Sequence, residues 1–386
     1  MSLQARYECL LAVQENYLRA DRAGKAAILD CLRTATGLNR KYMIARLNDP
    51  VLGRHKRRRE RGCEYGPDVV EAIGVIACAL GWICAERLKP ALWSTAMHLI
   101  AHGELEASEA VLWKLSSISV ATLARILKGI RPADRLPRAY PGRRSETAAQ
   151  RAVQVSVIPW DIPEAGHFEM DLVHHGVPDE RSRLVCTIQF IDVLTGWSER
   201  FAIMGTGFDA IYQAILAFKR HCPFAIREVH SDNGSEFINQ ALIVALGSEQ
   251  LCLTQTRGRP GYHNDNRFVE QKNNSLVRAY VGSTPLHTHE QLRGLQSLYD
   301  DMWIYYNLFQ PVLRQTRRTA ALGSDGIVHI RRSQDVARTP FERLLESKPP
   351  INRATRERLE HLIHDTSLMA LKSRIDQQVA TLRRSA

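Results

Sequence analysis

The sequence predicts a protein of several domains: an all-α amino-terminal region, an α/β core on a mixed five-stranded sheet, and a helical carboxyl-terminal extension. Three observations support this fold class. The first part of the chain has helical periodicity, a stretch of Pro, Arg and small polar residues follows, and the pattern then changes to strands. We therefore expect a helical region at 1–130, a basic linker at 131–163, the core at 164–310 and a carboxyl-terminal region with a helical tail at 311–386.

The positive charge of the chain is concentrated in its first part. Residues 1–150 contain 24 Lys and Arg against 15 Asp and Glu, whereas residues 151–386 contain 28 against 26. This asymmetry favours a polyanionic partner. The longest nearly uncharged run, residues 72–85, is shorter than the roughly 20 residues of a bilayer crossing, so no membrane partner is expected. The start has no apolar stretch suited to a secretory signal, which favours a cytoplasmic, nucleoid-associated protein.

Two segments of the amino-terminal region have the pattern of a helix-turn-helix. Residues 25–48 form two short amphipathic patterns separated at Gly37, and residues 115–132 form a second candidate in which Ser119 would cap a helix. Many helical hairpins share this pattern without touching DNA, but two such units before a basic linker favour sequence-specific DNA binding. The residues expected to face DNA are Asn39, Arg40, Lys41, Arg46, Arg125 and Lys128.

The core has an order of elements typical of a mixed sheet. Three strands are expected in succession at 167–175, 183–196 and 198–205, followed by an amphipathic helix at 208–222. Two further strands, one ending near Asp232 and one at 251–257, are each followed by a helix. A meander followed by strand–helix units suits five strands flanked by helices.

Three acidic residues far apart in the sequence are expected to converge in this core. Asp171 lies mid-strand on the face opposite the apolar stripe, and Asp232 lies at the tip of a later strand, in "REVHSDNGSEFINQ" (227–240). Glu270 falls in the first turns of a helix that begins after a polar, glycine-containing loop. Each acid alone is more commonly a solvated surface residue. Their placement on two strands and one helix start is what favours a shared site.

Clustered acids repel one another and need a compensating charge. Mg²⁺ or Mn²⁺ would supply it, because these ions prefer carboxylate oxygens, and two ions about 4 Å apart suit an in-line phosphoryl displacement. We expect Asp265 or Asn266 to cap the helix that carries Glu270. Glu236 is expected to begin the helix after Asp232 rather than to bind metal. Glu169 shares the face of Asp171 and is either an acid that supports the metal ligands or a residue at a solvent edge, and the solvent edge is favoured.

Residues 165–310 resemble the catalytic core of the retroviral-integrase superfamily, specifically the integrase-type DDE transposases of bacterial insertion sequences. The segments that carry the resemblance are "HFEMDLV", "FIDVLTGW", "VHSDNGSEF" and "GYHNDNRFVEQKNN". The resemblance implies a ribonuclease H-like fold with a catalytic, metal-binding triad of Asp171, Asp232 and Glu270 that holds two Mg²⁺ or Mn²⁺ ions during catalysis. The zinc module of retroviral integrases has no counterpart here, so no zinc is expected.

The resemblance also implies a function. The expected activity is that of a transposase, a metal-dependent polynucleotidyl transferase and endonuclease that binds the terminal repeats of a mobile element, cuts, and joins the freed end to target DNA. Its partner would be double-stranded DNA, on which it would act as a homo-oligomer, with room for a helper ATPase. Near the acids, DNA contacts are expected from Arg257, Arg259, Tyr262, Lys272, Asn273 and Asn274.

Two alternatives remain open at the level of sequence. A nuclease or resolvase on the same fold would cut without joining, because hydrolysis and strand transfer use the same carboxylates. A DNA-binding regulator with an inactive catalytic domain is the other alternative, although a silenced site has no reason to retain all three acids. The apolar stripe of the tail, which includes Leu368, Leu371 and Ile375, suits packing on its own chain or on a partner helix.

Overall fold

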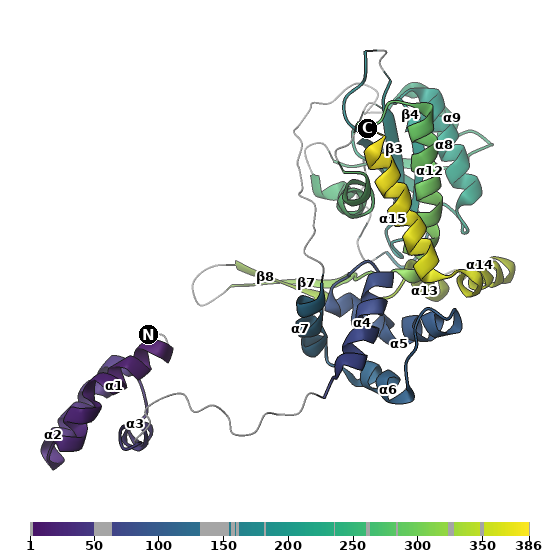
Figure 1. Ribbon diagram of the computed structural model, residues 1–386. Coiled ribbons are helices and arrows are strands. Elements are labelled where there is room, and N and C mark those ends of the chain that lie inside the picture. The colour runs from purple at the N-terminus through teal and green to yellow at the C-terminus, as the bar shows by residue number, and fades with distance from the viewer. Residues whose placement is uncertain are drawn as a thin grey trace. The chain divides into compact units, whose positions relative to one another are not determined.

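The computed structural model consists of two compact units, Met1–Glu64 and Tyr65–Ala386 (Figure 1). The sequence placed the first boundary at 131–163, most of which lies outside the described residues, whereas the two units divide within the region expected to be one helical domain. The structure describes residues 3–49, 64–131, 154–155, 159, 162–180, 183–234, 236–259, 263–282, 285–322, 328–347 and 351–385.

The first unit is built from α1 (Leu3–Arg19), α2 (Arg22–Thr36) and α3 (Arg40–Leu47) around its own apolar core. Gly37 ends α2 in a left-handed conformation, with φ of 68°, and the side chain of Asn39 caps α3 by accepting from the Lys41 N–H. The turn expected at Gly37 is therefore confirmed. The core side chains are Leu10, Tyr17, Leu29, Leu32, Met43 and Leu47.

The second unit begins with four helices: α4 (Pro67–Ala79), α5 (Ala85–Ala101), α6 (Glu109–Ser117) and α7 (Val120–Ile130). The Ser119 side chain accepts from the Thr122 N–H and caps α7, as expected. No single helix among the described residues has the length and apolarity of a membrane span; α6 and α7 pass that test only as a pair, and they are bent by 113°.

A six-stranded mixed sheet forms the centre of the second unit. Its order is β1-β6-β5-β2-β3-β4, with β2 antiparallel to β3, β3 antiparallel to β4, and β1, β6, β5 and β2 parallel. The five predicted strands are confirmed, in the order and directions of a ribonuclease H-like sheet. The strands are β1 (Gln154–Val155), β2 (His167–His174), β3 (Val185–Asp192), β4 (Ser198–Met204), β5 (Glu228–Ser231) and β6 (Thr254–Arg257).

Helices cover both faces of this sheet. One face packs Phe168, Met170 and Phe190 against α8 (Phe208–His221) and α9 (Gln240–Leu246). The opposite face, which carries Asp171, packs against α10 (Arg267–Lys272), the π-helical segments η3 (Asn273–Arg278) and η4 (Tyr305–Phe309), and α12 (His289–Ile304). A short 3-10 segment η2 (His263–Asn266) precedes α10, and α11 (Ala279–Val281) follows η3.

The edge of the sheet at β4 is capped by side chains. The Asn307 amide accepts from the Ser198 N–H and donates to the Ser198 carbonyl, both at 2.9 Å, and Gln296 of α12 accepts from the Ala202 N–H at 2.9 Å. These groups occupy backbone positions that another strand would otherwise use.

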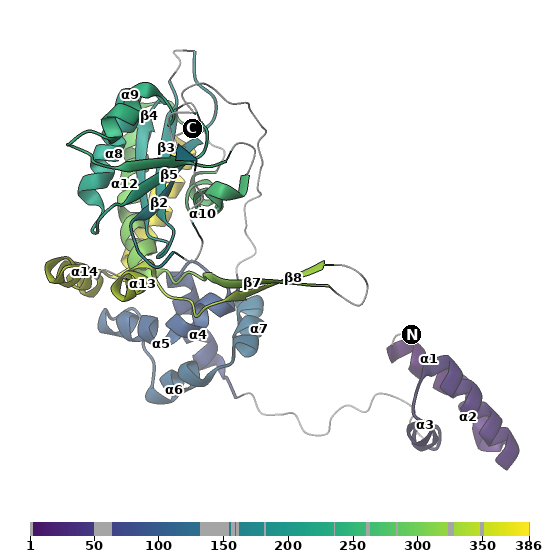
Figure 2. The same ribbon diagram turned by 180° about the vertical axis from the view of Figure 1, so that it is seen from behind.

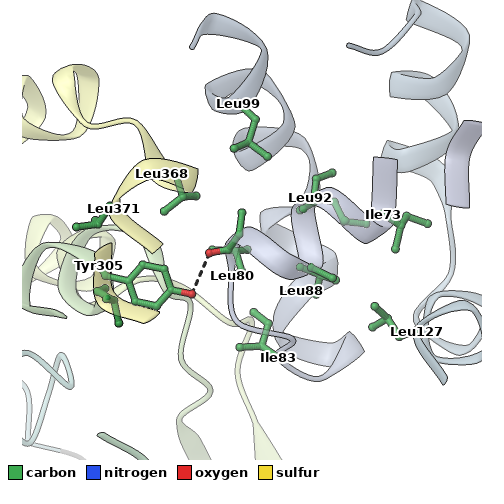
Figure 3. Close-up of a cluster of buried hydrophobic side chains, with 14 of the residues drawn as sticks. Ile73, Leu80, Ile83, Leu88, Leu92, Leu99, Leu127, Tyr305, Leu368 and Leu371 are labelled. Carbon is green, nitrogen blue, oxygen red and sulfur yellow. Dashed lines mark hydrogen bonds between the residues drawn. The ribbon is translucent and has the colours of Figure 1, made fainter. Parts of the chain in front are cut away.

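The carboxyl-terminal region joins the helices α4–α7 to the sheet. It contains the hairpin β7 (Gln315–Leu322) and β8 (Val328–Gln334), then α13 (Pro340–Glu346), α14 (Arg353–Asp365) and α15 (Leu368–Arg384). Leu368 and Leu371 of α15 lie in one apolar core with α4, α5 and α12 (Figure 3). The Tyr305 hydroxyl donates to the Ala79 carbonyl at 2.9 Å across the same junction. The stripe of the tail thus packs on its own chain.

Candidate active site

Asp171 and Asp232 lie at neighbouring positions on two adjacent parallel strands. The pairing of β2 with β5 runs to Met170 and Ser231, and the next residue on each strand is one of the two acids. Asp171 is partly buried and Asp232 is exposed at the end of β5. The Gly234 N–H donates to the Asp232 carboxylate at 2.9 Å and so orders the turn that leads the chain away. The strand pairing therefore places these two acids side by side.

Glu270 is exposed on α10, above the same face of the sheet. Its charge reaches Asp171. The pKa of Asp171 is raised to about 7, mainly by burial and further by the charges of Asp232 and Glu270. Burial also raises the pKa of Asp232, with a contribution from Glu236. A buried carboxyl whose ionisation is penalised by two neighbouring acids forms a site that a cation would stabilise.

Glu169 fixes the start of the helix that carries Glu270. Its carboxylate accepts from the Phe268 N–H at 2.6 Å and from the Val269 N–H at 2.9 Å, and its side chain is 1% exposed. Burial raises its pKa to about 8. Two expectations were wrong here: Glu169 is not at a solvent edge, and the helix is capped by this distant carboxylate rather than by the side chain of Asn266, which makes no capping bond.

Asp265 and Asn266 do not cap α10 but attach the loop before it to its surroundings. The Asp265 carboxylate receives the Arg259 backbone N–H and guanidinium, each at 2.9 Å, and Arg259 lowers the pKa of that carboxyl. The Asn266 amide donates to the Met170 carbonyl at 3.1 Å, one residue before Asp171. The loop and β2 are therefore joined beside the acids.

Asn273 faces the acids. Its amide donates to the Asp171 carboxylate at 2.5 Å, and its side chain is 5% exposed, whereas Asn274 is exposed. The sequence placed these two asparagines on one face with Glu270. The change from α10 to the π-helix η3 at Asn273 alters the spacing of side chains around the axis, and helical periodicity of 3.6 residues does not foresee it.

Arg257 and Asn233 connect the ends of β5 and β6. The buried Arg257 guanidinium donates to the Asn233 amide oxygen at 2.7 Å, and the Asn233 amide donates to the Gly258 carbonyl at 3.0 Å. Arg257 was expected to contact DNA, but burial at 5% exposure makes it a brace of the turn that follows Asp232. Glu236 lies in this turn as well, because α9 begins only at Gln240, so its expected place at a helix start was wrong.

A row of polar side chains continues from the acids across the sheet. Asp171 is paired with Gln189 on β3, which is paired with Arg200 on β4. Among the described residues, neither amide atom of Gln189 and no nitrogen of the Arg200 guanidinium has a hydrogen-bond partner. The Arg200 guanidinium lies 5.6 Å from the Tyr299 ring centroid and 5.9 Å from that of Tyr306. Burial lowers the pKa of Arg200.

Several side chains predicted to contact DNA can be placed. Lys41, Arg125 and Lys128 are exposed, and Lys272 lies 5.0 Å from the Tyr306 ring centroid. Arg46 is held by Asp49 at 3.1 Å and lies over the Tyr7 ring. Arg40 pairs with Asp30, Asn39 is the cap described above, and Tyr262 lies outside the described residues.

The chemistry of the donor set can be compared with that of a divalent-cation site. In the parts of the chain that the structure describes, no three His, Cys, Asp or Glu side chains are already close enough to hold a metal ion together. The residues nonetheless suit one, because carboxylate oxygens are the preferred ligands of Mg²⁺ and because Asp232 and Glu270 raise the pKa of Asp171.

Similar proteins include a sequence relative and two solved structures. No protein-family model matches the chain. The uncharacterized protein y4rM from Sinorhizobium fredii (strain NBRC 101917 / NGR234) is 33% identical over 322 residues, which is 83% of this chain and 90% of y4rM. The simian T-cell lymphotropic virus intasome in complex with PP2A regulatory subunit B56 gamma gives a TM-score of 0.30 at 15% identity, covering 56% of this chain and 69% of that chain. The catalytic core domain of BIV integrase gives a TM-score of 0.29 at 18% identity, covering 47% and 94%.

Proposed function

This chain belongs to the family of the uncharacterized protein y4rM, and from its acid cluster we propose that it is a metal-dependent polynucleotidyl transferase that acts on DNA, in the role of a transposase. The observation that supports the proposal is the adjacency of Asp171 and Asp232, together with the influence of Glu270 on Asp171. Two acids occupy adjacent positions on parallel strands, and the third is near enough to raise the pKa of Asp171.

We propose that Asp171, Asp232 and Glu270 hold two Mg²⁺ or Mn²⁺ ions. The chemistry that such ions supply when bound is activation of the attacking oxygen and stabilisation of the leaving oxygen in an in-line displacement at phosphorus. The side chains of this chain hold the geometry. Asn273 orients the Asp171 carboxylate, and Glu169 fixes the first turn of α10, so that Glu270 stays above the two strand acids.

The proposed substrates are the ends of a mobile element and a target duplex. The exposed residues Lys41, Arg125 and Lys128 support binding through the helices that precede the sheet, because phosphate contacts need accessible cations. Joining two ends to one target needs two catalytic sites together, and we therefore propose a homo-oligomer on DNA.

The test uses the full chain, with labelled duplexes taken from both sides of its gene and a supercoiled plasmid as target. With Mg²⁺ or Mn²⁺ we expect cleavage and then joined products. Asp232→Asn and Glu270→Gln should each lower the cleavage rate at least about 1,000-fold, because each removes one negative charge from the metal ligands.

Glu249→Gln is the matched control. Glu249 is an exposed acid in the loop before β6, whereas the candidate site lies beyond the other end of β6. It should cleave as the unaltered chain does. Cleavage without joined products would identify a nuclease, and specific end binding without any cleavage would identify a regulator. Full cleavage by Glu270→Gln would contradict the proposed site.

A further inference from the structure

The β7–β8 hairpin combines a dense basic charge with an absence of acids. Its two strands, Gln315–Leu322 and Val328–Gln334, contain four arginines and no Asp or Glu. The four hairpin arginines are Arg317, Arg318, Arg331 and Arg332.

The register of the hairpin brings these arginines to one section of the ribbon. Arg318 is directly opposite Arg332, Arg317 is opposite Ser333, and Arg331 is opposite Thr319. The register therefore gathers basic residues along two paired strands, and this placement suits a hairpin that binds a polyanion.

The base of the hairpin is tied to the candidate active site. Arg314, the residue before β7, lies with its guanidinium 4.8 Å from the ring centroid of Phe268, two residues before Glu270. Its backbone N–H donates to Asp335, the residue after β8, at 3.0 Å. Arg343 of α13 pairs with the same Asp335 at 2.6 Å. These contacts anchor the base of the hairpin beside α10 and α13.

Both ribbon views show the hairpin extending on the side of the sheet where α10 lies (Figures 1 and 2). A strand of seven or eight residues spans about 25 Å at roughly 3.3 Å per residue, which is close to the length of seven base pairs. A two-stranded ribbon also has a width that the major groove of B-DNA admits.

We propose that the β7–β8 hairpin is a DNA-binding arm that contacts the phosphates of the duplex cut at Asp171, Asp232 and Glu270. This inference rests on the proposed function, because it assigns the partner of the hairpin from the substrate of that site. The arm supplies affinity and orientation, while the acids supply the chemistry.

The test replaces the four hairpin arginines with glutamine in the full chain and measures binding of a fluorescent 30-base-pair duplex at several salt concentrations. Each lost phosphate contact should reduce the slope of log affinity against log salt by about 1, so a reduction of about 2 to 4 is expected. At about 100 mM salt the affinity should fall roughly 10- to 100-fold.

The matched control removes four exposed arginines from the carboxyl-terminal helices: Arg353, Arg356, Arg358 and Arg384. It lowers the net charge equally and should change affinity less than about twofold. Equal losses in both variants would show that only total charge matters, and would overturn the proposal. So would unchanged binding by the hairpin variant, or a duplex RNA that displaces the DNA at lower concentration than DNA itself.

Cleavage measured in parallel separates this inference from the proposed function. The hairpin variant should recover most of its cleavage rate at high DNA concentration, whereas Asp232→Asn should not recover at any concentration. Thermal unfolding checks that the variant folds, and it should unfold no earlier than the unaltered chain because the opposed charges are gone. If even the unaltered chain does not cleave DNA, the slope of log affinity against log salt still decides whether the hairpin binds DNA.

Discussion

A row of polar residues, Asp232, Asp171, Gln189 and Arg200, crosses the sheet, and both of its ends carry charge in an unfavourable setting. The two ends differ in whether that charge is accessible. At one end, Asp171 and Asp232 lie side by side and their pKa values are raised. At the other end, Arg200 is buried with no hydrogen-bond partner for its guanidinium among the described residues. Asp232 and the nearby Glu270 are exposed, whereas Arg200 lies against two tyrosine rings. Unfavourable charge that is accessible suits a ligand, and unfavourable charge that is enclosed suits a structural role.

The surroundings of the acid end can be tested through Glu169, which lies two residues before Asp171 on β2, and through the pH dependence of stability. Glu169 has a pKa of about 8 in the folded chain, above its ordinary value near 4.5. Between these pH values the unfolded chain loses the proton and the folded chain retains it, so the free energy of unfolding falls as pH rises and the loss is complete above about 8.

Glu169→Gln removes this titration while its amide oxygen can still accept from the Phe268 and Val269 N–H groups. At pH 8 we expect an increase of a few kcal/mol in the free energy of unfolding, measured by denaturant titration, and almost no change at pH 4. Glu249→Gln, as the exposed control, should be flat. A lower stability at pH 8 would mean that the charge itself is needed at the start of α10.

The basic end gives the second test. Arg200→Met keeps much of the side-chain volume and removes a buried charge that lacks hydrogen bonds, so the free energy of unfolding should rise by about 1–3 kcal/mol. DNA cleavage should be retained. Gln189→Met provides the control for a neutral residue in the same row. Loss of cleavage in a folded Arg200→Met chain would show that the two ends act together.

The third test concerns cation binding. Asp171 has a pKa of about 7 without a cation, so binding of Mg²⁺ or Mn²⁺ must release its proton at lower pH. Affinity measured by calorimetry should fall by up to about tenfold per pH unit below 7 and be nearly constant above it. Proton release, read from two buffers of different ionisation enthalpy, should disappear in Asp171→Asn. A constant affinity from pH 5 to 8 would contradict binding of the cation by Asp171.

The strands of the core could be predicted from sequence, because alternation is a local signal. The meeting of Asp171 with Asp232 was expected from their places on two predicted strands and from the family resemblance. β1 could not be predicted, because it is two residues long and lies in a stretch of linker composition. The role of Glu169 could not be predicted either, since its N–H partners are about 100 residues away. An acid between Phe168 and Met170 was the available signal.

Other differences have the same origin in tertiary structure. Helices α4–α7 show ordinary amphipathic patterns, but nothing local indicates that their apolar surface continues into α12 and α15. The π-helix at Asn273 changes which side chains face Asp171 by a small change in winding that residue types do not encode. Arg257 is indistinguishable in sequence from an exposed phosphate contact.

The capped edge at β4 limits how copies of this chain can assemble. Asn307 and Gln296 already occupy backbone groups that an incoming strand would need. Continuous sheets across two subunits, and the fibrous aggregates that grow from open edges, are therefore disfavoured on this side. At this edge, an assembly on DNA would form through helical surfaces or through the nucleic acid itself.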